Sequence, residues 1–356
     1  MKFTISTAEF QKLLKNASRV VTNNKLVTLG SYISLSSSGN ELTTITSDGN
    51  NYLYLTTASS GDAFTVVVDF EKLNKLVSKF TCENITVEEK DHQLKIKGNG
   101  NYTLNILVDS LGNKVEYPNP YVDAPIDVEY SETINSEIIK RVINISESSL
   151  ALPNSCIYEN YYLGECSIAT DSYRITKIDN SLCRESFIIH PKTLSLINIV
   201  DKEDVSVEYN KEQIQFIAPN FIVYSTLPKN SSEFALDAIQ DVLSSSFKDS
   251  VVVDRKQLIS ALDRLELFID YYDKNTITLH FKSDSLEVMT QSEENVEQIP
   301  YSEGTSNDFT CKIDITLLLS QLKTLESTDI TIEQGENTGA IKLLDNDIIK
   351  YIALVV

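Results

Sequence analysis

The feature that most restricts the fold of this chain is an internal repeat. Three segments each read as a short strand, a helix-start residue, an apolar helix, a polar turn and an alternating strand. They are FTVVVDFEKLNKLVSKFTCENITVE from Phe64, SFIIHPKTLSLINIVDKEDVSVE from Ser186 and FTCKIDITLLLSQLKTLESTDITIE from Phe309. Their helix-start residues Asp69, His190 and Asp314 lie 121 and 124 residues apart. A repeat of this period indicates that one structural unit is used several times.

A second set of segments interleaves with the first. These are FTISTAEFQKLLKNAS from Phe3, ETINSEIIKRVINIS from Glu132 and VVVDRKQLISALDRL from Val251. The strands between the helices alternate in hydropathy, as half-exposed antiparallel strands do. We therefore predict an α+β chain of three similar domains at 1–125, 126–248 and 249–356, each a duplicated unit of a helix and antiparallel strands. Turn-forming tracts such as EYPNPYVDAP and LSSSFKDS suit the joints between them.

The predicted helices are amphipathic, with basic residues on the face away from the apolar stripe. In the first, the stripe is Phe10, Leu13, Leu14, Ala17 and Val21; in the second it is Leu73, Leu76, Val77 and Phe80. The basic residues of the helices are Lys12, Lys15, Arg19, Lys72, Lys75, Lys79, Lys140, Arg141, Arg255, Lys256 and Arg264. On a single helix such residues usually form a solvated face. Repeated on successive equivalent helices, they suggest one shared basic surface.

The rest of the composition limits the possible functions. The formal net charge is −20, so any attraction for nucleic acid has to be local. Five scattered cysteines without a C-x-x-C pair favour reduced thiols over disulfides or a zinc site. His92, His190 and His280 lie far apart, and no phosphate-binding Gly-Lys loop is present. We expect no catalytic residue, no metal and no cofactor. The N-terminus lacks the apolar core of a signal peptide, and no apolar run is long enough to span a membrane, which predicts a cytoplasmic protein.

One heptapeptide, ATDSYRI from Ala169, has the pattern of a hairpin turn followed by an apolar strand. Together with the N-terminal MKFTIS, TSDGNNYLYL from Thr46 and EYPN from Glu116, it resembles the bacterial sliding clamp, the beta subunit of DNA polymerase III. The resemblance extends over the whole length and agrees with the repeat.

The resemblance implies a ring-forming homodimer in which two chains join head to tail around duplex DNA. Helices would line the hole and contact DNA without reading its sequence, while acidic sheets form the outer wall. The DNA-facing residues would be the basic helix residues above and Lys25 in the loop after the first helix. Ring closure would pair an edge strand at 102–108, with Tyr102 and Leu104, against the partner chain, and Leu267 and Phe268 would fill its apolar centre.

The resemblance also implies a pocket for short peptides of the polymerase and the clamp loader. Its residues in this chain would be Thr170, Ser172, Tyr173, Arg174, Ile175, Val242, Leu243, Ile352, Leu354 and Val356. A further pocket residue would fall between Ser155 and Ile157. The family tail typically reads Met-Pro-Met/Val-Arg, whereas this sequence ends in Leu-Val-Val, and Ser244 stands where a proline aligns.

Three classes of function follow. The first is a non-catalytic clamp that tethers the polymerase for processivity. The second is a repeat scaffold without a DNA role, which would be a monomer with no salt-dependent DNA affinity. The third is an enzyme, which measurable nuclease or hydrolase activity would reveal.

Overall fold

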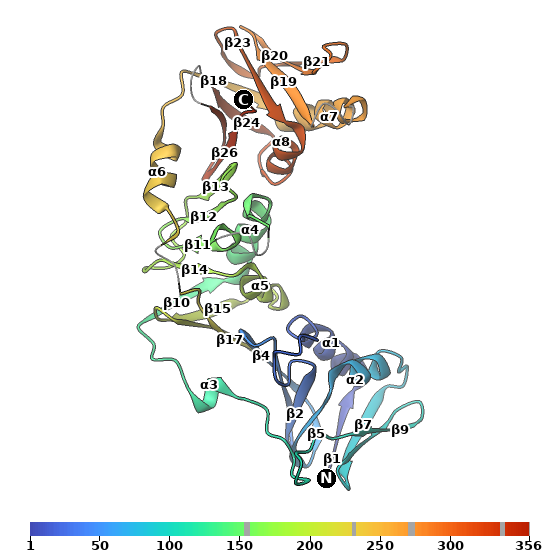
Figure 1. The fold of residues 1–356 in the computed structure, drawn as a ribbon. Coiled ribbons are helices and arrows are strands. Elements are labelled where there is room, and N and C mark those ends of the chain that lie inside the picture. Colours follow the sequence, from blue (N-terminus) through green and yellow to red (C-terminus); the bar gives the residue numbers. More distant parts are fainter. Residues whose placement is uncertain (153–156, 230–232, 270–274, 335–338, 356) are drawn as a thin grey trace. The chain divides into compact units, whose positions relative to one another are not determined.

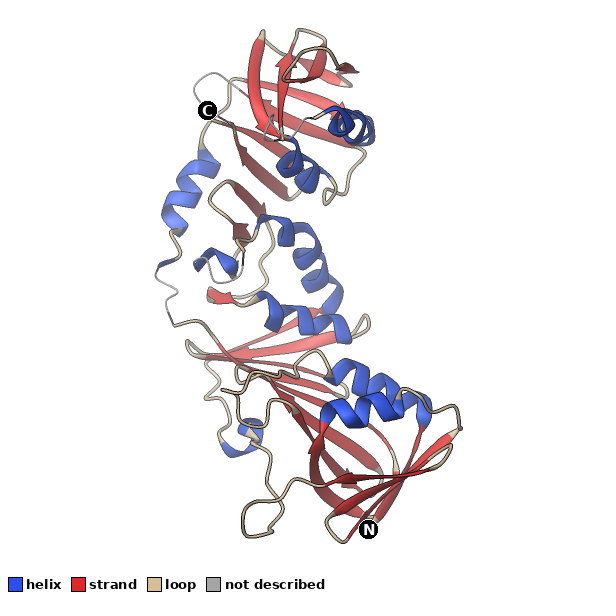
Figure 2. Ribbon diagram, turned by 45° about the vertical axis from the view of Figure 1, so that its right-hand side comes forward, coloured by secondary structure: helices blue, strands red, loops and turns tan. Residues whose placement is uncertain are grey.

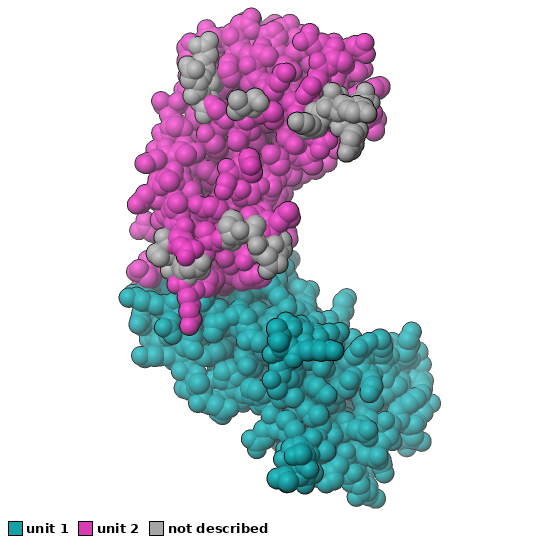
Figure 3. Space-filling view, in the orientation of Figure 1, with its two compact units in different colours: residues 1–139, 192–227 teal, residues 140–191, 228–356 magenta. Residues whose placement is uncertain are grey.

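The computed structural model describes residues 1–152, 157–229, 233–269, 275–334 and 339–355 (Figure 1). The chain divides into two compact units (Figure 3). Unit 1 consists of Met1–Ile139 and Lys192–Leu227, and unit 2 of Lys140–Pro191 and Pro228–Val356. The boundaries of the units fall inside the predicted second domain. The division into three duplicated domains therefore stays a prediction.

Unit 1 contains two antiparallel sheets. In spatial order, the strands of the smaller sheet are β5 (Ser60–Gly61), β1 (Lys2–Ser6), β7 (Asn84–Lys90), β8 (Gln93–Lys97) and β9 (Asn101–Asn105). Those of the larger sheet are β10 (Tyr130–Asn135), β15 (Asp204–Tyr209), β16 (Gln213–Ala218), β17 (Phe221–Thr226), β4 (Asn51–Ala58), β3 (Glu41–Ser47), β2 (Tyr32–Ser38) and β6 (Ala63–Asp69).

Unit 2 also contains two antiparallel sheets. The larger one runs in the order β14 (Phe187–Ile189), β11 (Tyr161–Leu163), β12 (Ser167–Thr170), β13 (Arg174–Ile178), β26 (Ile348–Ala353), β25 (Ala340–Asp345), β24 (Asp329–Gln334), β18 (Asp249–Asp254) and β22 (Glu303–Thr305). The smaller one runs β21 (Val296–Pro300), β20 (Ser285–Thr290), β19 (Thr276–Phe281) and β23 (Phe309–Asp314).

Six helices of the described residues come after strands of the predicted repeat, whereas two lie in connecting segments that were not predicted to be helical (Figure 2). They are α1 (Thr7–Ala17), α2 (Phe70–Val77), α3 (Pro120–Asp123), α4 (Ser136–Ser146), α5 (Pro191–Ser195), α6 (Leu236–Ser244), α7 (Arg255–Leu265) and α8 (Ile315–Leu322). Short 3₁₀ turns lie at η1 (Glu147–Ser149), η2 (Ile157–Glu159), η3 (Leu196–Ile199) and η5 (Glu266–Phe268). None of the helices in the described residues is long and apolar enough to cross a membrane.

The predicted helix-start residues Asp69 and Asp314 share one local role with Asp254, which precedes α7. The carboxylate of Asp69 accepts a hydrogen bond from the backbone N–H of Lys72, that of Asp254 from Gln257, and that of Asp314 from Thr316 and Leu317. Such side chains satisfy backbone donors that a helix leaves unpaired in its first turn. The alternating strands that close the three repeated segments begin at Asn84, Asp204 and Asp329.

Two details of the predicted apolar stripes are wrong. The first helix ends at Ala17, so Val20 rather than Val21 is fully buried. In the second, Leu73 and Val77 are buried, but Leu76 is only half-buried. In the first helix, the stripe drawn at constant helical spacing fails where the helix stops, because the backbone then turns out of that register.

Candidate functional site

The heptapeptide forms the turn between β12 and β13, and its own side chains hold the turn. Asp171 Oδ1 accepts hydrogen bonds from the backbone N–H groups of Tyr173 at 2.9 Å and Arg174 at 2.7 Å. Thr170 Oγ1 accepts from the N–H of Ser172 at 3.1 Å and donates to the carbonyl of Arg174 at 2.7 Å. Ser172 has a φ of 75°, in the left-handed region. Short Thr and Asp side chains are suited to these local bonds.

Arg174 is oriented by this turn and by α8. Its guanidinium donates to Asp171 Oδ2 from Nε at 2.9 Å and from Nη2 at 2.5 Å, and its Nη1 donates to Ser320 Oγ at 3.1 Å. The paired side chains of Arg174 and Asp171 are mostly buried. Arg174 therefore first fixes the turn against α8, and a peptide would meet only its remaining donors.

Strand pairing separates the predicted pocket residues between two faces of the sheet. Thr170 lies opposite Ile175, whereas Arg174 lies opposite Ile352, and residues directly opposite each other in an antiparallel pair share a face. Arg174 and Ile352 thus lie on the face that carries α8, and Thr170 and Ile175 on the other. Ile352 is fully buried and Leu354 is half-buried, while Val356 lies outside the described residues, as does Ser155.

An apolar cluster with α6 occupies the second face. We call it the α6 cluster; its buried members are Cys166, Ile168, Ile175, Ile188, Phe234, Ile239 and Leu243. Val242, Ile349 and Tyr351 are partly buried against it. The structure therefore brings Ile175, Val242 and Leu243 together as predicted. From the C-terminal strand it contributes Tyr351 and Ile349, which the sequence reasoning missed. The alternation of β26 could have identified these two residues, because Ile352 and Leu354 occupy the alternate positions of the sequence from Ile349 and Tyr351.

Tyr173 lies at the tip of the turn between β12 and β13. Its side chain is 66% exposed, and its carbonyl accepts a hydrogen bond from the N–H of Ala353 at 2.9 Å. The C-terminal segment continues alongside, because the N–H of Leu354 donates to Gly339 at 2.9 Å and that of Val355 to Lys312 at 2.8 Å. An exposed aromatic ring is suited to binding an apolar side chain of a peptide.

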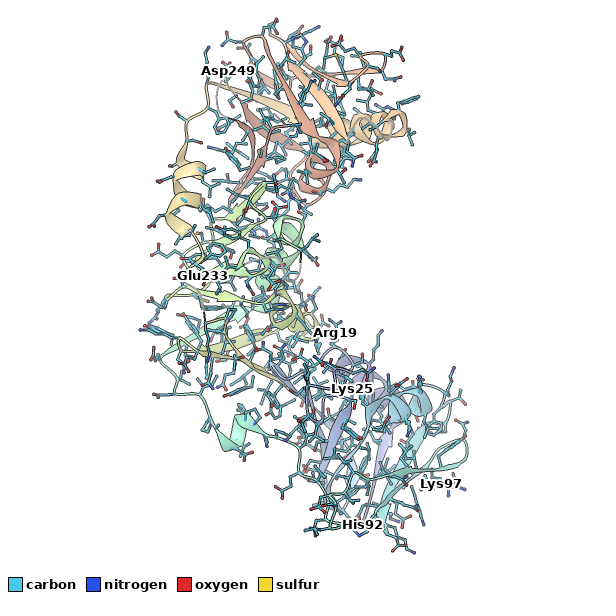
Figure 4. All side chains as sticks on the ribbon, viewed as in Figure 1. Arg19, Lys25, His92, Lys97, Glu233 and Asp249 are labelled. Atoms are coloured by element: carbon cyan, nitrogen blue, oxygen red, sulfur yellow. The ribbon has the colours of Figure 1, made fainter. Side chains whose placement is uncertain are left out.

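In unit 1, α1 and α2 form a second candidate site (Figure 2). The amide Nε2 of Gln11 joins the helices by donating to the carbonyls of Val77 at 2.9 Å and Phe80 at 3.0 Å. The basic side chains of this pair are all exposed: Lys12, Lys15, Arg19, Lys72, Lys75 and Lys79. Of these six residues, only Lys75 has an acidic partner in the described part of the chain, Glu71. Lys25 is also exposed, and Figure 4 shows it with Arg19 beyond the end of α1.

The basic residues of unit 2 are mostly engaged. Arg141 binds Glu326 at 2.8 Å and Asp347 at 2.7 Å, and these hydrogen bonds raise the pKa of its guanidinium. Arg255 donates to the carbonyls of Ser327 at 2.7 Å and Leu322 at 3.3 Å, and Arg264 pairs with Glu297 at 2.6 Å. Lys256 is exposed and Lys140 half-buried. A guanidinium already bound to carboxylates has few donors left for phosphate.

The residues predicted for ring closure lie at surface positions. Tyr102 on β9 is 41% exposed and packs on Phe80, with ring centroids 5.5 Å apart; Leu104 is half-buried. Leu267 and Phe268, in η5, are 80% and 58% exposed. The edge strand predicted at 102–108 is shorter than expected. The strand β9 ends at Asn105, because Ile106 forms a bridge to Val68 and Val108 one to Lys114 within the same unit.

A family model and solved structures that match this chain belong to one protein family. Residues 1–119 match the family model of the DNA polymerase III beta subunit, N-terminal domain. A search of curated proteins found no relative. Among solved structures, the DNA polymerase III subunit beta of Pseudomonas aeruginosa is similar with a TM-score of 0.84 and 17% identity, covering 100% of both chains. The sliding clamp of Bacillus subtilis has a TM-score of 0.84 and 19% identity, covering 100% of this chain and 99% of that one.

The beta subunit of Streptococcus pyogenes gives a similar result, with a TM-score of 0.84, 18% identity and complete coverage of both chains. The resemblance found in the sequence is thus confirmed. The chain has the fold of the bacterial DNA polymerase III beta subunits, the sliding clamps, over its whole length, and its residues 1–119 match the N-terminal domain model of that family.

Proposed function

We propose that this chain is a non-catalytic DNA sliding clamp that tethers a replicative polymerase to duplex DNA in the cytoplasm. In this role two copies close head to tail into a ring, each copy contributing three domains with boundaries near 125 and 248. The supporting observation is the exposed basic pair α1–α2 in a chain of net charge −20 with a full-length clamp fold. Sliding needs phosphate attraction without base readout, and flexible lysines provide it.

The exposure and the ion pairs of the basic residues reduce the number of them that we propose to face DNA. Lys12, Lys15, Arg19, Lys25, Lys72 and Lys79 are exposed and have no acidic partner in the described part of the chain. Arg141 and Arg264 are bound to carboxylates, and we leave them, with the backbone-bound Arg255, out of the set. In this proposal, most of the attraction for DNA phosphates comes from the basic residues of α1 and α2 and the loops that follow them.

A charge-reversal experiment tests this role. The variant Lys12→Glu/Lys15→Glu/Lys72→Glu should lose retention on circular duplex DNA, and each lost contact should reduce the slope of log affinity against log salt by about 0.9. The control variant Lys90→Glu/Lys95→Glu/Lys97→Glu makes the same charge change on β7 and β8. Figure 4 shows Lys97 on the sheet, away from α1. Equal retention by both variants, or a monomer without salt-dependent DNA affinity, would favour the scaffold alternative.

The proposed partner site is the α6 cluster face with the turn of β12 and β13. Thr170, Ser172, Tyr173, Ile175, Val242 and Leu243 would contact the peptide, and Tyr351 and Ile349 would join them from the C-terminal strand. Arg174 would act by holding the turn, and Ile352 and Leu354 by anchoring the strand. Short segments of the polymerase and of the clamp loader are the proposed ligands, bound through aliphatic and aromatic anchors.

Ring closure is proposed to join β9 of one copy to the second copy beside Leu267 and Phe268. The strand β9 is an edge of its sheet, as is β21 of the smaller sheet in unit 2. Edge strands have unpaired backbone groups that can pair with another chain. The exposed pair Leu267 and Phe268 would supply the apolar contact.

A further inference from the structure

The larger sheet of unit 1 has a second covered face, opposite to the face that carries α1 and α2. Thr46 on β3 points to α1, because its Oγ1 donates to the carbonyl of Ala17 at 3.3 Å. Successive strand residues alternate between faces, so Thr43 and Ile45 point the other way. There a segment that we call the strap, residues 114–126, covers the sheet. Figures 1 and 2 show its helix α3 on the side of the sheet away from α1 and α2.

The strap is anchored to this face by tyrosines. The hydroxyl of Tyr117 donates to the carbonyl of Leu29 at 3.3 Å, that of Tyr224 donates to Ala124 at 3.3 Å, and that of Tyr54 accepts from the N–H of Tyr121 at 3.2 Å. Tyr117 and Ile126 of the strap are buried in a cluster with Ile45, Tyr54, Val67 and Tyr224. The strap therefore has a fixed position over the sheet, as the wall of a binding groove must have.

This arrangement repeats the architecture of the α6 cluster. In unit 2 the hairpin β12–β13 pairs with β26, and in unit 1 the hairpin β3–β4 pairs with β17. Ile175 lies opposite Tyr351 in the first case, and Tyr52 lies opposite Tyr224 in the second. A connecting segment with a helix, α6 or α3, packs its apolar residues on each face. The internal repeat thus produces two similar sheet junctions.

Between the strap and the sheet lies a groove of about 940 Å³. This volume is within the usual range for ligand sites. Its floor is a row of hydroxyls on neighbouring strands, with Ser36 Oγ and Thr65 Oγ1 2.9 Å apart and Thr43 Oγ1 and Thr56 Oγ1 3.1 Å apart. Its wall includes Tyr121 and the 64% exposed Val122. The groove therefore offers both hydrogen-bonding and apolar contacts.

The charged and polar atoms of the groove favour a donor-rich, cationic ligand. Glu41, Glu116 and Asp123 line it, are exposed and have no basic partner among the described residues. The single lysine of the lining, Lys114, is paired with Glu89 at 3.0 Å. Asn119 Oδ1 is buried and accepts no hydrogen bond within the described chain, although buried acceptors normally find a donor. An extended peptide with lysine or arginine side chains supplies both donors and positive charge.

We propose that this groove is a second peptide-docking site, which binds a short basic segment of a partner protein. The segment lies extended between the strap and the sheet, its cationic groups at Glu41, Glu116 and Asp123 and an apolar side chain against Val122 and Tyr121. The site is separate from the α6 cluster, and it does not rest on the proposed DNA role.

The experiment uses the full chain without DNA and a fluorescein-labelled probe peptide, KVRYKVK. At 0.1 M salt its anisotropy should report saturable binding, and the variant Glu41→Gln/Glu116→Gln/Asp123→Asn should weaken this at least tenfold. The matched control Glu83→Gln/Asp91→Asn/Glu294→Gln removes the same charge at exposed positions outside the groove and should change the affinity less than twofold. All three carboxylates of the groove are exposed, so both variants should keep the circular dichroism of the parent chain.

Two outcomes would overturn the proposal. Equal weakening in both variants would mean that the probe binds the acidic surface diffusely, and absence of saturable binding would mean that the groove takes no such ligand. Hydrogen exchange gives the location independently: the bound probe should protect backbone amides of the strap, of β3 and of β4. Protection confined to 234–243 would place the probe on the α6 cluster instead. Retention on DNA, measured separately, should be the same in both variants.

Discussion

Lys350 is an ionisable group in the interior of unit 2. It lies on β26 opposite Thr176 and is fully buried. Its Nζ donates to the carbonyl of Ile145 at 2.9 Å and to the hydroxyl of Thr324. Burial, and then the nearby positive charge of Arg174, lower the pKa of the Lys350 ammonium from 10.5 to about 7. Lysine is rarely buried without an acidic partner, because the charged form loses its hydration.

The lowered pKa predicts a definite pH dependence of stability. Between about pH 7 and 10.5 the unfolded chain holds a proton on Lys350 that the folded chain has released, so the free energy of unfolding rises with pH. Below pH 7 both states hold the proton, and the cost of burying the charge reaches its maximum. At roughly 1.4 kcal/mol per pKa unit, this maximum is about 5 kcal/mol.

The variant Lys350→Met removes the titrating group at similar side-chain volume. The two lost hydrogen bonds cost roughly 1–3 kcal/mol for each partner left unsatisfied, so the sign of the change at a single pH is a weak test. The way in which this change in stability varies between two pH values is a strong test. Urea unfolding gives the free energy of unfolding of both chains at each pH. The value for the variant minus the value for the parent should fall by about 2 kcal/mol from pH 7 to pH 9. Groups other than Lys350 titrate in both chains, so their effects cancel in this difference. A constant difference across this range would refute the reasoning.

Four further predictions follow from individual contacts. Leu267→Ala/Phe268→Ala should yield monomers in sedimentation, and an unchanged dimer would contradict the proposed ring contact. Ile175→Ser/Leu243→Ser should abolish binding of polymerase-derived peptides while leaving retention on DNA intact; unchanged peptide affinity would move that site elsewhere. Arg141→Gln should destabilise the chain by roughly 1 kcal/mol in urea unfolding at pH 7, because a half-exposed pair is partly screened. Arg141 lowers the pKa of the Asp347 carboxyl, so the stabilisation by this pair is lost as the pH falls through that lowered value. The free energy of unfolding of the variant should therefore fall less steeply with decreasing pH in the acid range. Asp314→Ala should cost about 1 kcal/mol in thermal unfolding, since two backbone donors of α8 lose their acceptor; an unchanged melting temperature would remove the capping argument.

Features that depend on residues close together in the chain could be predicted from the sequence. The strands and helices of the repeat lie where the alternation and the helix-start residues predicted them, as at Asp69 and Asp314. Helix capping and strand alternation act over two to four residues, so a short stretch of sequence contains the whole interaction. The resemblance to the clamp family was likewise readable from local motifs and the repeat period.

How distant segments of the chain meet could not be predicted in the same way, because it depends on the folded arrangement. The sequence reasoning took Ile352 and Leu354 as pocket residues, whereas the register of β26 against β13 turns Tyr351 and Ile349 to the α6 cluster. Arg141 looked like a DNA contact, but it meets Glu326 and Asp347, 185 and 206 residues away in sequence. A shift of one residue in strand pairing exchanges the two faces of the strand, and no local pattern specifies which distant carboxylate a long side chain will reach.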